Sequence, residues 1–348
     1  MRTSLAKRLA AGLVALGTLA ACSHASPSGP VGNPDGQLAK AAGQAGAFTH
    51  LEALQKIADD NGGTRETPSP GYDASVEYVA KVLRDAGYEV STPTFEATSS
   101  SDDDEDSRKR PRRQGSYRNV IAQTRTGDPN RVVFLGAHLD SVPEGPGIND
   151  DGSGVAALLE LATRLGSSPG VHNAVRFAFW GSEESDMIGS AYYVKNLSGQ
   201  QRQQILLYMN LDMVASPNAG YFVQGGSGGK KKGAGPPGSS TVARVITEQL
   251  TKTGVQVEPM KFAGDSDYDP FVRAGIPSAG PLTGDEKKMT DEQASKWGGE
   301  SGEVFDRCYH QACDNLANIN RTALDRNVRA TAAALEYFAS YTGGLTSE

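Results

Sequence analysis

The chain has 348 residues, of which 38% are hydrophobic and 22% are charged. This length and composition fit one large globular domain or two small ones. There are 41 acidic and 34 basic residues, a formal net charge of -7, and this acidic balance argues against nucleic acid as a partner.

The N-terminus predicts export. A basic start is followed by a short apolar run over residues 9–19 and then by Leu19-Ala-Ala-Cys22. Because the run is too short for a transmembrane helix, it indicates a signal peptide over 1–21. The small residues before Cys22 resemble a bacterial lipobox, in which that cysteine carries a lipid after cleavage. The alternative is a plain signal peptide cut near Ala25. We expect an exported protein, anchored by lipid on the outer side of the cell membrane or secreted.

The rest of the chain predicts a tether followed by one domain. Residues 22–45 are rich in Ser, Pro, Gly and Ala and predict a flexible tether, with order beginning near Phe48. A single domain is expected over 46–343. An acidic block meets a basic block near 99–115, which predicts a disordered or hairpin insertion. A second insertion near 225–240 is rich in Gly, Lys and Pro.

Within the domain, helical and strand patterns alternate. Helices are predicted from a three-to-four-residue apolar period near 51–60, 73–85, 155–165, 187–197, 242–253 and 322–341. Buried strands are predicted at 131–137, 174–180, 205–211 and 276–279. Apolar strands separated by helices are typical of an α/β fold with a mostly parallel sheet covered by helices on both faces.

Histidine and carboxylate side chains follow the predicted central strands. Sites in open parallel sheets form at the carboxyl ends of the strands, so these side chains are expected to gather at one edge. In chain order they are His138, Asp140, Asp150, Glu183, Glu184 and Asp212.

One further histidine lies between two cysteines. His310 falls inside the segment from Cys308 to Cys313, and the chain has only one other cysteine, Cys22. In an exported protein the close pair predicts a disulfide. Such a bond would restrict the loop that presents the His310 imidazole.

Two imidazoles and three carboxylates, with no thiolate, suit zinc. Five ligands serve two zinc ions with three ligands each when one carboxylate bridges, and this count favours a co-catalytic pair. The five candidate ligands are His138, Asp150, Glu184, Asp212 and His310.

Two carboxylates beside these ligands have other predicted roles. Glu183 is not in the ligand set but is adjacent to Glu184, so it is the candidate general base for an attacking water. Asp140 lies two residues after His138 and is expected to accept the second ring N–H of that histidine.

Five segments together resemble the co-catalytic di-zinc aminopeptidase family, closest to the Streptomyces griseus aminopeptidase type. The similarity runs from about His50 to Tyr341 apart from the two insertions, and it implies an α/β sandwich around a mixed, mostly parallel sheet. The segments are Gly136–Val142, Gly147–Gly154, Phe179–Glu184, Asn210–Asp212 and Phe305–His310.

The resemblance implies a role for each candidate. It places one zinc on His138 and Asp212 and the other on Glu184 and His310, with Asp150 bridging. It also implies that Glu183 is the general base, that Tyr309 helps to stabilise the tetrahedral oxyanion, and that Cys308 pairs with Cys313. The peptide bond between Asp150 and Asp151 is expected to be cis, and Asp151 is expected to support the ligands without binding metal.

The sequence departs from the family pattern at three places. Asp265 stands where the family has an arginine, and Tyr268 stands where it has a histidine. Either a substrate contact is lost there or Asp265 favours a basic substrate residue. Arg321 and Asp325 occupy the positions of two acids of a calcium site, so calcium is doubtful. Lys230–Lys232 lie in an insertion that could border the substrate cleft.

The expected function is therefore that of an exported, membrane-tethered zinc aminopeptidase. It should act as a monomer on peptides with a free N-terminus, with apolar first residues by analogy to the family. Alternatives on the same scaffold are a single-zinc glutaminyl cyclase, a carboxypeptidase, or a non-catalytic receptor-like binding protein.

Overall fold

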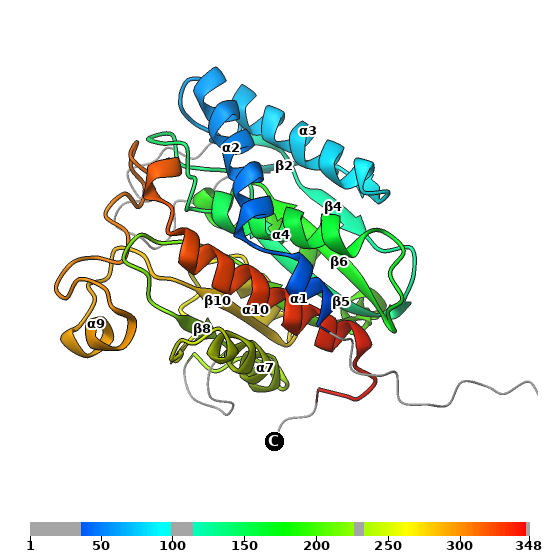
Figure 1. Cartoon of the computed structure of the whole chain (residues 1–348). Coiled ribbons are helices and arrows are strands. Elements are labelled where there is room, and N and C mark those ends of the chain that lie inside the picture. The colour runs from blue at the N-terminus through cyan, green and yellow to red at the C-terminus, as the bar shows by residue number, and fades with distance from the viewer. Residues whose placement is uncertain (1–35, 99–113, 226–232, 346–348) are drawn as a thin grey trace, which may run out of the picture. The chain divides into compact units, whose positions relative to one another are not determined.

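The computed structural model describes residues 36–98, 114–225 and 233–345 (Figure 1). The expected signal peptide, Cys22 and the greater part of the predicted tether lie outside the described residues, as do Lys230–Lys232, most of the first insertion and part of the second. Within these ranges, none of the helices is both long enough and apolar enough to span a membrane.

The described chain alternates between helices and strands. The strands are β1 (Glu89–Ser91), β2 (Thr94–Thr98), β3 (Gln114–Arg118), β4 (Val120–Gln123), β5 (Asp128–His138), β6 (Asn173–Trp180), β7 (Ile205–Asn210), β8 (Phe222–Gln224), β9 (Glu258–Met260) and β10 (Ser278–Leu282). The α-helices are α1 (Gln37–Ala41), α2 (Gln44–Asp60), α3 (Pro70–Asp85), α4 (Gly152–Leu165), α5 (Ile188–Lys195), α6 (Gly199–Gln204), α7 (Ser239–Lys252), α8 (Tyr268–Arg273), α9 (Asp291–Trp297) and α10 (Arg321–Ser340).

The central sheet is mixed and has the strand order β1-β4-β6-β5-β7-β10-β8-β9. Its middle is parallel: β5 pairs in parallel with β6 on one side and with β7 on the other, and β10 pairs in parallel with β7. The pairs β1–β4, β4–β6 and β8–β10 are antiparallel. The predicted fold class, a mostly parallel sheet between helices, is confirmed.

Alternate residues of β5 enter two different hydrophobic cores. Val133 and Leu135 belong to the core shared with α2, α3, α4, α7 and α10. Figure 1 shows several of these helices covering one face of the sheet. Val132 and Phe134 belong to the opposite core, where Phe271 of α8 stacks on Tyr208 of β7 at a centroid distance of 3.8 Å. Side chains of a strand alternate between its faces, so burial on both explains why β5 reads as a continuous apolar run.

Helical structure begins earlier than the sequence pattern predicted. Residues 22–45 lack apolar periodicity and were expected to form a tether, yet α1 and the first two residues of α2 fall inside this range. Carboxylates of α10 satisfy the free backbone groups at both helix starts: Glu336 accepts the N–H of Leu38 at 2.8 Å, and Asp325 accepts that of Gln44 at 3.0 Å. These partners lie about 300 residues away in the chain, so a local pattern cannot reveal them.

The first insertion is carried by a two-stranded ribbon. β2 and β3 pair antiparallel, with Thr94 opposite Arg118 and Phe95 opposite Tyr117. This pairing brings the two described ends of the 99–113 segment together. The segment itself lies outside the described residues.

Candidate metal and active site

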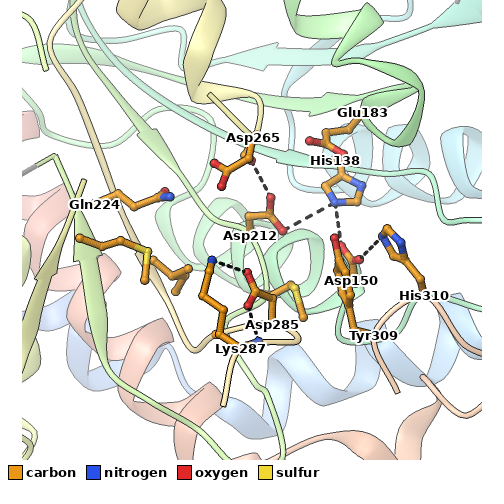
Figure 2. A pocket seen from close by; sticks show the side chains of 15 residues that line it. His138, Asp150, Glu183, Asp212, Gln224, Asp265, Asp285, Lys287, Tyr309 and His310 are labelled. Carbon is orange, nitrogen blue, oxygen red and sulfur yellow. Dashed lines mark hydrogen bonds and ion pairs between the residues drawn. The ribbon is translucent and has the colours of Figure 1, made fainter. Parts of the chain in front are cut away.

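The predicted site residues converge at the carboxyl edge of the parallel strands. His138 is the last residue of β5, Glu183 and Glu184 follow β6 in a short 3₁₀ turn, and Asp212 follows β7. These three strands are neighbours in the sheet, so the chain segments that leave them are also neighbours (Figure 2). Asp150 enters the same space from the loop before α4.

The Asp150 carboxylate lies between two imidazoles. Its Oδ1 is 3.0 Å from Nε2 of His138, and its Oδ2 is 3.2 Å from Nε2 of His310. Each imidazole also faces a second carboxylate: His138 Nε2 is 3.7 Å from Asp212 Oδ1, and His310 Nε2 is 3.0 Å from Glu184 Oε2. One aspartate thus connects two histidine–carboxylate pairs.

The side chains form two groups of three that share Asp150. One group is His138, Asp150 and Asp212, and the other is Asp150, Glu184 and His310. In each group, one ligand atom per residue lies within 4.8 Å of the others. The five residues predicted as metal ligands are therefore together in space.

The orientation of His138 is set by neighbouring main-chain and side-chain groups. Its Nδ1 lies 3.2 Å from the backbone carbonyl of Asp140 and 3.7 Å from the carboxylate of the same residue. The Asp140 carbonyl is therefore the hydrogen-bond partner, whereas the sequence had suggested the carboxylate. The Asp140 carboxylate instead accepts the backbone N–H groups of Glu183 at 3.1 Å and Glu184 at 3.3 Å.

Asp151 supports the site from behind. Its carboxylate accepts backbone N–H groups of His138 at 3.2 Å, Met213 at 3.2 Å and Gly154 at 2.8 Å, the last of these capping α4. It therefore ties together the segments that carry His138, Asp150 and Asp212. The peptide bond between Asp150 and Asp151 is cis, as expected from the sequence.

A carboxylate that the sequence did not single out holds the Asp150 loop. Asp314 accepts the N–H of Asn149 at 2.8 Å and that of Asp150 at 3.0 Å. Burial raises the pKa of Asp314 to about 7 even though these two bonds oppose the rise. Its position directly after Cys313 was the available signal, because the disulfide loop also carries His310.

A fully buried arginine holds the single loop that runs from His138 to Asp150. The guanidinium of Arg65 donates to the carbonyls of Leu139, of Pro146 at 2.9 Å and of Gly147 at 2.6 Å. The Arg65 side chain is 0% exposed. Its position after Gly62-Gly63 suggested only the end of a helix, so the sequence did not reveal this role.

Glu183 and Glu184 sit in a strained turn at the end of β6. Ser182, just before them, has φ of 65°, a left-handed conformation that residues other than glycine rarely adopt. Burial, reinforced by the negative charges of Asp267, Asp212 and Glu184, raises the pKa of Glu183 well above its usual range. Burial also raises the pKa of Glu184, and its Oε1 has no hydrogen-bond partner within the described ranges.

The loop that carries His310 is closed by a disulfide between Cys308 and Cys313. His310 has φ of 56°, so the loop holds its backbone in the left-handed region. The Tyr309 ring stacks on the His310 imidazole at a centroid distance of 3.8 Å. Figure 2 shows both side chains beside Asp150.

The carboxylates strongly favour positive charge at the two imidazoles. Burial lowers the pKa of His138, but the nearby carboxylates of Asp140, Asp150 and Asp212 outweigh it and raise the pKa well above its usual range. Burial likewise opposes protonation of His310, yet Asp150 and Glu184 raise its pKa to about 11. The centre thus attracts cations, either protons or metal ions.

The segment that departs from the family pattern still contacts the site. Ser266 donates to Asp212 Oδ2 at 2.6 Å and accepts from Asn210 at 2.8 Å, so it orients the aspartate. Asp265 and Ser266 both line the pocket beside the candidate ligands. Asp267 is buried, and this burial raises its pKa to about 7.

The two positions matched to calcium ligands make other contacts. The Arg321 guanidinium lies 3.3 Å from the ring centroid of Phe48, and the Asp325 carboxylate accepts from Arg329 at 2.8 Å and from the backbone of Gln44. These contacts hold α10 against α2.

Comparison with known proteins by sequence places the chain in one peptidase family. The model of Peptidase family M28 matches residues 119–335. The probable lipoprotein aminopeptidase LpqL of Mycobacterium tuberculosis is 51% identical over 232 residues, which are 65% of this chain and 46% of that protein. Leupeptin-inactivating enzyme 1 of Streptomyces exfoliatus is 43% identical over 291 residues, 82% of this chain and 60% of that protein. The chain thus spans about half the length of these curated relatives.

Solved structures share the fold at low sequence identity. The aminopeptidase of Aneurinibacillus sp. strain AM-1 superposes with a TM-score of 0.67 and 18% identity, over 90% of this chain and 97% of that one. Porphyromonas gingivalis glutaminyl cyclase superposes with a TM-score of 0.62 and 20% identity, over 84% of this chain and 98% of that one. The scaffold alone therefore does not separate peptide hydrolysis from cyclisation.

Proposed function

The chain belongs to peptidase family M28, and from that premise we propose that it is a zinc aminopeptidase that removes N-terminal residues from peptides. The observation that carries the proposal is the shared Asp150, which completes two separate groups of three candidate ligands. Catalytic zinc sites use three protein ligands and one open position, so two such groups suit two zinc ions.

The donor set fits zinc. His138 and Asp212 would hold one ion, Glu184 and His310 would hold the other, and Asp150 would bridge them. Imidazole and carboxylate donors suit this metal, and the unpartnered Glu184 Oε1 is a buried acceptor that a bound cation would satisfy. When bound, zinc supplies Lewis acidity, which lowers the pKa of water and polarises a carbonyl.

Glu183 is the proposed general base. Its carboxylate lines the pocket beside His138 and Asp212 without belonging to either ligand group. Its raised pKa suits a group that accepts a proton from the attacking water and returns it to the leaving amine. Asp140 positions Glu183 by accepting its backbone N–H.

Tyr309 is the proposed donor to the tetrahedral oxyanion. Burial raises the pKa of its hydroxyl far above the usual range, and the charges of Asp150, Glu184 and Glu183 add to the rise, so the hydroxyl keeps its proton at neutral pH. Stacking on His310 fixes the ring at the rim of the pocket.

The same proposal covers the cell location and the partners. The basic and apolar start and the lipobox at Cys22 support export with a lipid anchor, as does the name of the LpqL relative. The partners are then peptides with a free N-terminus and the membrane, with the protein as a monomer and no calcium requirement.

Metal analysis combined with two substrates tests the activity. We expect about two zinc ions per chain, cleavage of Leu-p-nitroanilide, loss of that cleavage with a chelator and its return with zinc. A single zinc with cyclisation of an N-terminal glutamine would favour a glutaminyl cyclase. Release of C-terminal residues would favour a carboxypeptidase. A folded, zinc-loaded protein with none of these activities would favour a binding protein.

A further inference from the structure

The pocket beside the candidate metal ligands is lined by both apolar and polar side chains. Its apolar lining includes Met213, Met260 and Leu282, and its polar lining includes Gln224 and Asp265 (Figure 2). Flexible methionine side chains adapt to linear aliphatic groups. A purely apolar substrate side chain would use the wall but would make no polar contact with Gln224 or Asp265.

Gln224 places a polar side chain in the wall of the pocket. It is the last residue of β8, and it is only 7% exposed. Its amide makes no hydrogen bond to any residue in the described ranges, and in Figure 2 it points into the pocket toward Asp265. The Gln224 amide is therefore available to a ligand in the pocket, and its carbonyl oxygen can accept a hydrogen bond from a donor there.

The Asp265 carboxylate is oriented by the hydroxyl group of Tyr268. The Tyr268 hydroxyl donates to Asp265 Oδ1, and the same hydroxyl oxygen accepts the backbone N–H groups of Ala263 at 3.0 Å and Gly264 at 3.0 Å. Tyr268 is 0% exposed, so the phenol is fixed. Asp265 itself is exposed, and among the described residues its Oδ2 has no partner, so this oxygen is available to a ligand in the pocket that Asp265 lines.

We infer that this pocket recognises an N-terminal lysine or arginine of the substrate through Asp265 and Gln224. The inference rests on the proposed aminopeptidase function and names its substrate class. The aliphatic stem would lie along Met260 and Leu282. The cationic end would donate to Asp265 Oδ2 and to the Gln224 carbonyl oxygen, which together accept two of its several N–H groups.

The remaining charged groups of the pocket agree with a cationic ligand. Lys287 is the one lysine of this lining, and its Nζ is 3.1 Å from Asp285, so its charge is compensated. A leucine side chain in the same place would leave the Asp265 carboxylate without a counter-charge and the Gln224 amide without a partner. The lining therefore favours lysine or arginine over an apolar residue of equal length.

Lysine and norleucine p-nitroanilides give a matched test on the zinc-loaded, full-length protein. The two side chains have the same stem and differ by the ε-ammonium group. We expect wild type to prefer lysine in kcat/KM, and Asp265→Asn to lower the lysine-to-norleucine ratio by roughly threefold to tenfold, the effect of removing a partly exposed ion pair with a charged hydrogen bond. Tyr268→Phe should lower the ratio in the same direction.

Asp269→Asn is the control variant. It makes the same charge change four residues away, on a carboxylate that pairs with Arg273 at 2.6 Å and does not line the pocket, and it should leave the ratio unchanged. An equal fall for both substrates in Asp265→Asn would overturn the inference, because Asp265 would then serve the α-ammonium common to both. A ratio unaffected by Asp265→Asn would overturn it as well. Cleavage of neither substrate by wild type would refute the proposed function itself.

Discussion

The carboxylate of Asp140 accepts the backbone N–H of Glu183 at 3.1 Å. Asp140 also offers its own carbonyl to the His138 ring at 3.2 Å. One residue thus connects the end of β5, which delivers a candidate ligand, to the turn after β6, which delivers the candidate base. The Glu183 carboxylate itself is left free to face the pocket.

Replacing Glu183 with glutamine tests the base directly. Glutamine keeps the shape but cannot accept a proton at neutral pH, so kcat should fall by about 10²- to 10⁴-fold, the usual contribution of general base catalysis. Zinc content should remain that of wild type, because Glu183 belongs to neither ligand group. Near-normal kcat in a zinc-loaded variant would contradict the assigned role.

His310→Ala tests the division of ligands between two metals. The variant removes one of the three donors in the group of Asp150, Glu184 and His310, so the purified protein should retain about one zinc instead of two. His172→Ala is the control, since His172 bonds Asn173 at 2.9 Å and lies outside the site. Full zinc retention in His310→Ala, measured by elemental analysis, would speak against the assignment.

Arg65→Met should weaken both the fold and the site. It removes the buried donor to the carbonyls of Leu139, Pro146 and Gly147 and leaves them unsatisfied, at a cost of about 3–5 kcal/mol in the free energy of unfolding. Zinc retention during dialysis should fall too, because this loop joins His138 to Asp150.

The surface variant Arg118→Gln is the comparison for Arg65. Arg118 pairs with Asp73 and Glu77, both of which are more than half exposed, so its loss should change the free energy of unfolding by less than about 1 kcal/mol. Urea titration of both variants checks the contrast. An equal loss in the free energy of unfolding for both variants would show that the buried hydrogen bonds of Arg65 contribute no more to stability than the surface ion pairs of Arg118.

His50 should contribute to acid sensitivity away from the site. Burial lowers its pKa from 6.5 to about 4, so the unfolded chain binds a proton more readily than the folded one between these values. Stability from this group is therefore complete above pH 6.5 and is lost as the pH falls through about 4, by at most about 3 kcal/mol. His50→Gln should lose less stability than wild type between pH 7 and pH 4.5 in urea titrations, and equal losses would refute the effect.

Most of the parallel sheet and the five clustered side chains could be predicted because each signal is local. β5, β6 and β7 are apolar runs, and His138, Glu184 and Asp212 each follow one of them directly. The three-residue strands β1, β8 and β9 are too short to show a period, so they were not predicted. β1 and β9, the two edge strands, also lack the two-sided burial that marks β5.

The partners that hold the site could not be predicted because they come from distant segments. Arg65 reaches the loop carbonyls from between α2 and α3, and Asp314 reaches the Asp150 loop from the disulfide segment. The start of α1 depends in the same way on Glu336. The sequence pattern within one segment does not indicate which hydrogen bonds that segment makes to a distant segment.

Helix α1 lies against the last turns of α10, beside the residues that lead into β6, and β6 runs from there toward the edge of the sheet that carries the candidate site. Eight residues of strand separate these two ends, roughly 25 Å. The described chain therefore begins at the end of the sheet opposite the one where His138 and Asp212 lie, and a group joined to its N-terminal end would not have to pass in front of the candidate pocket.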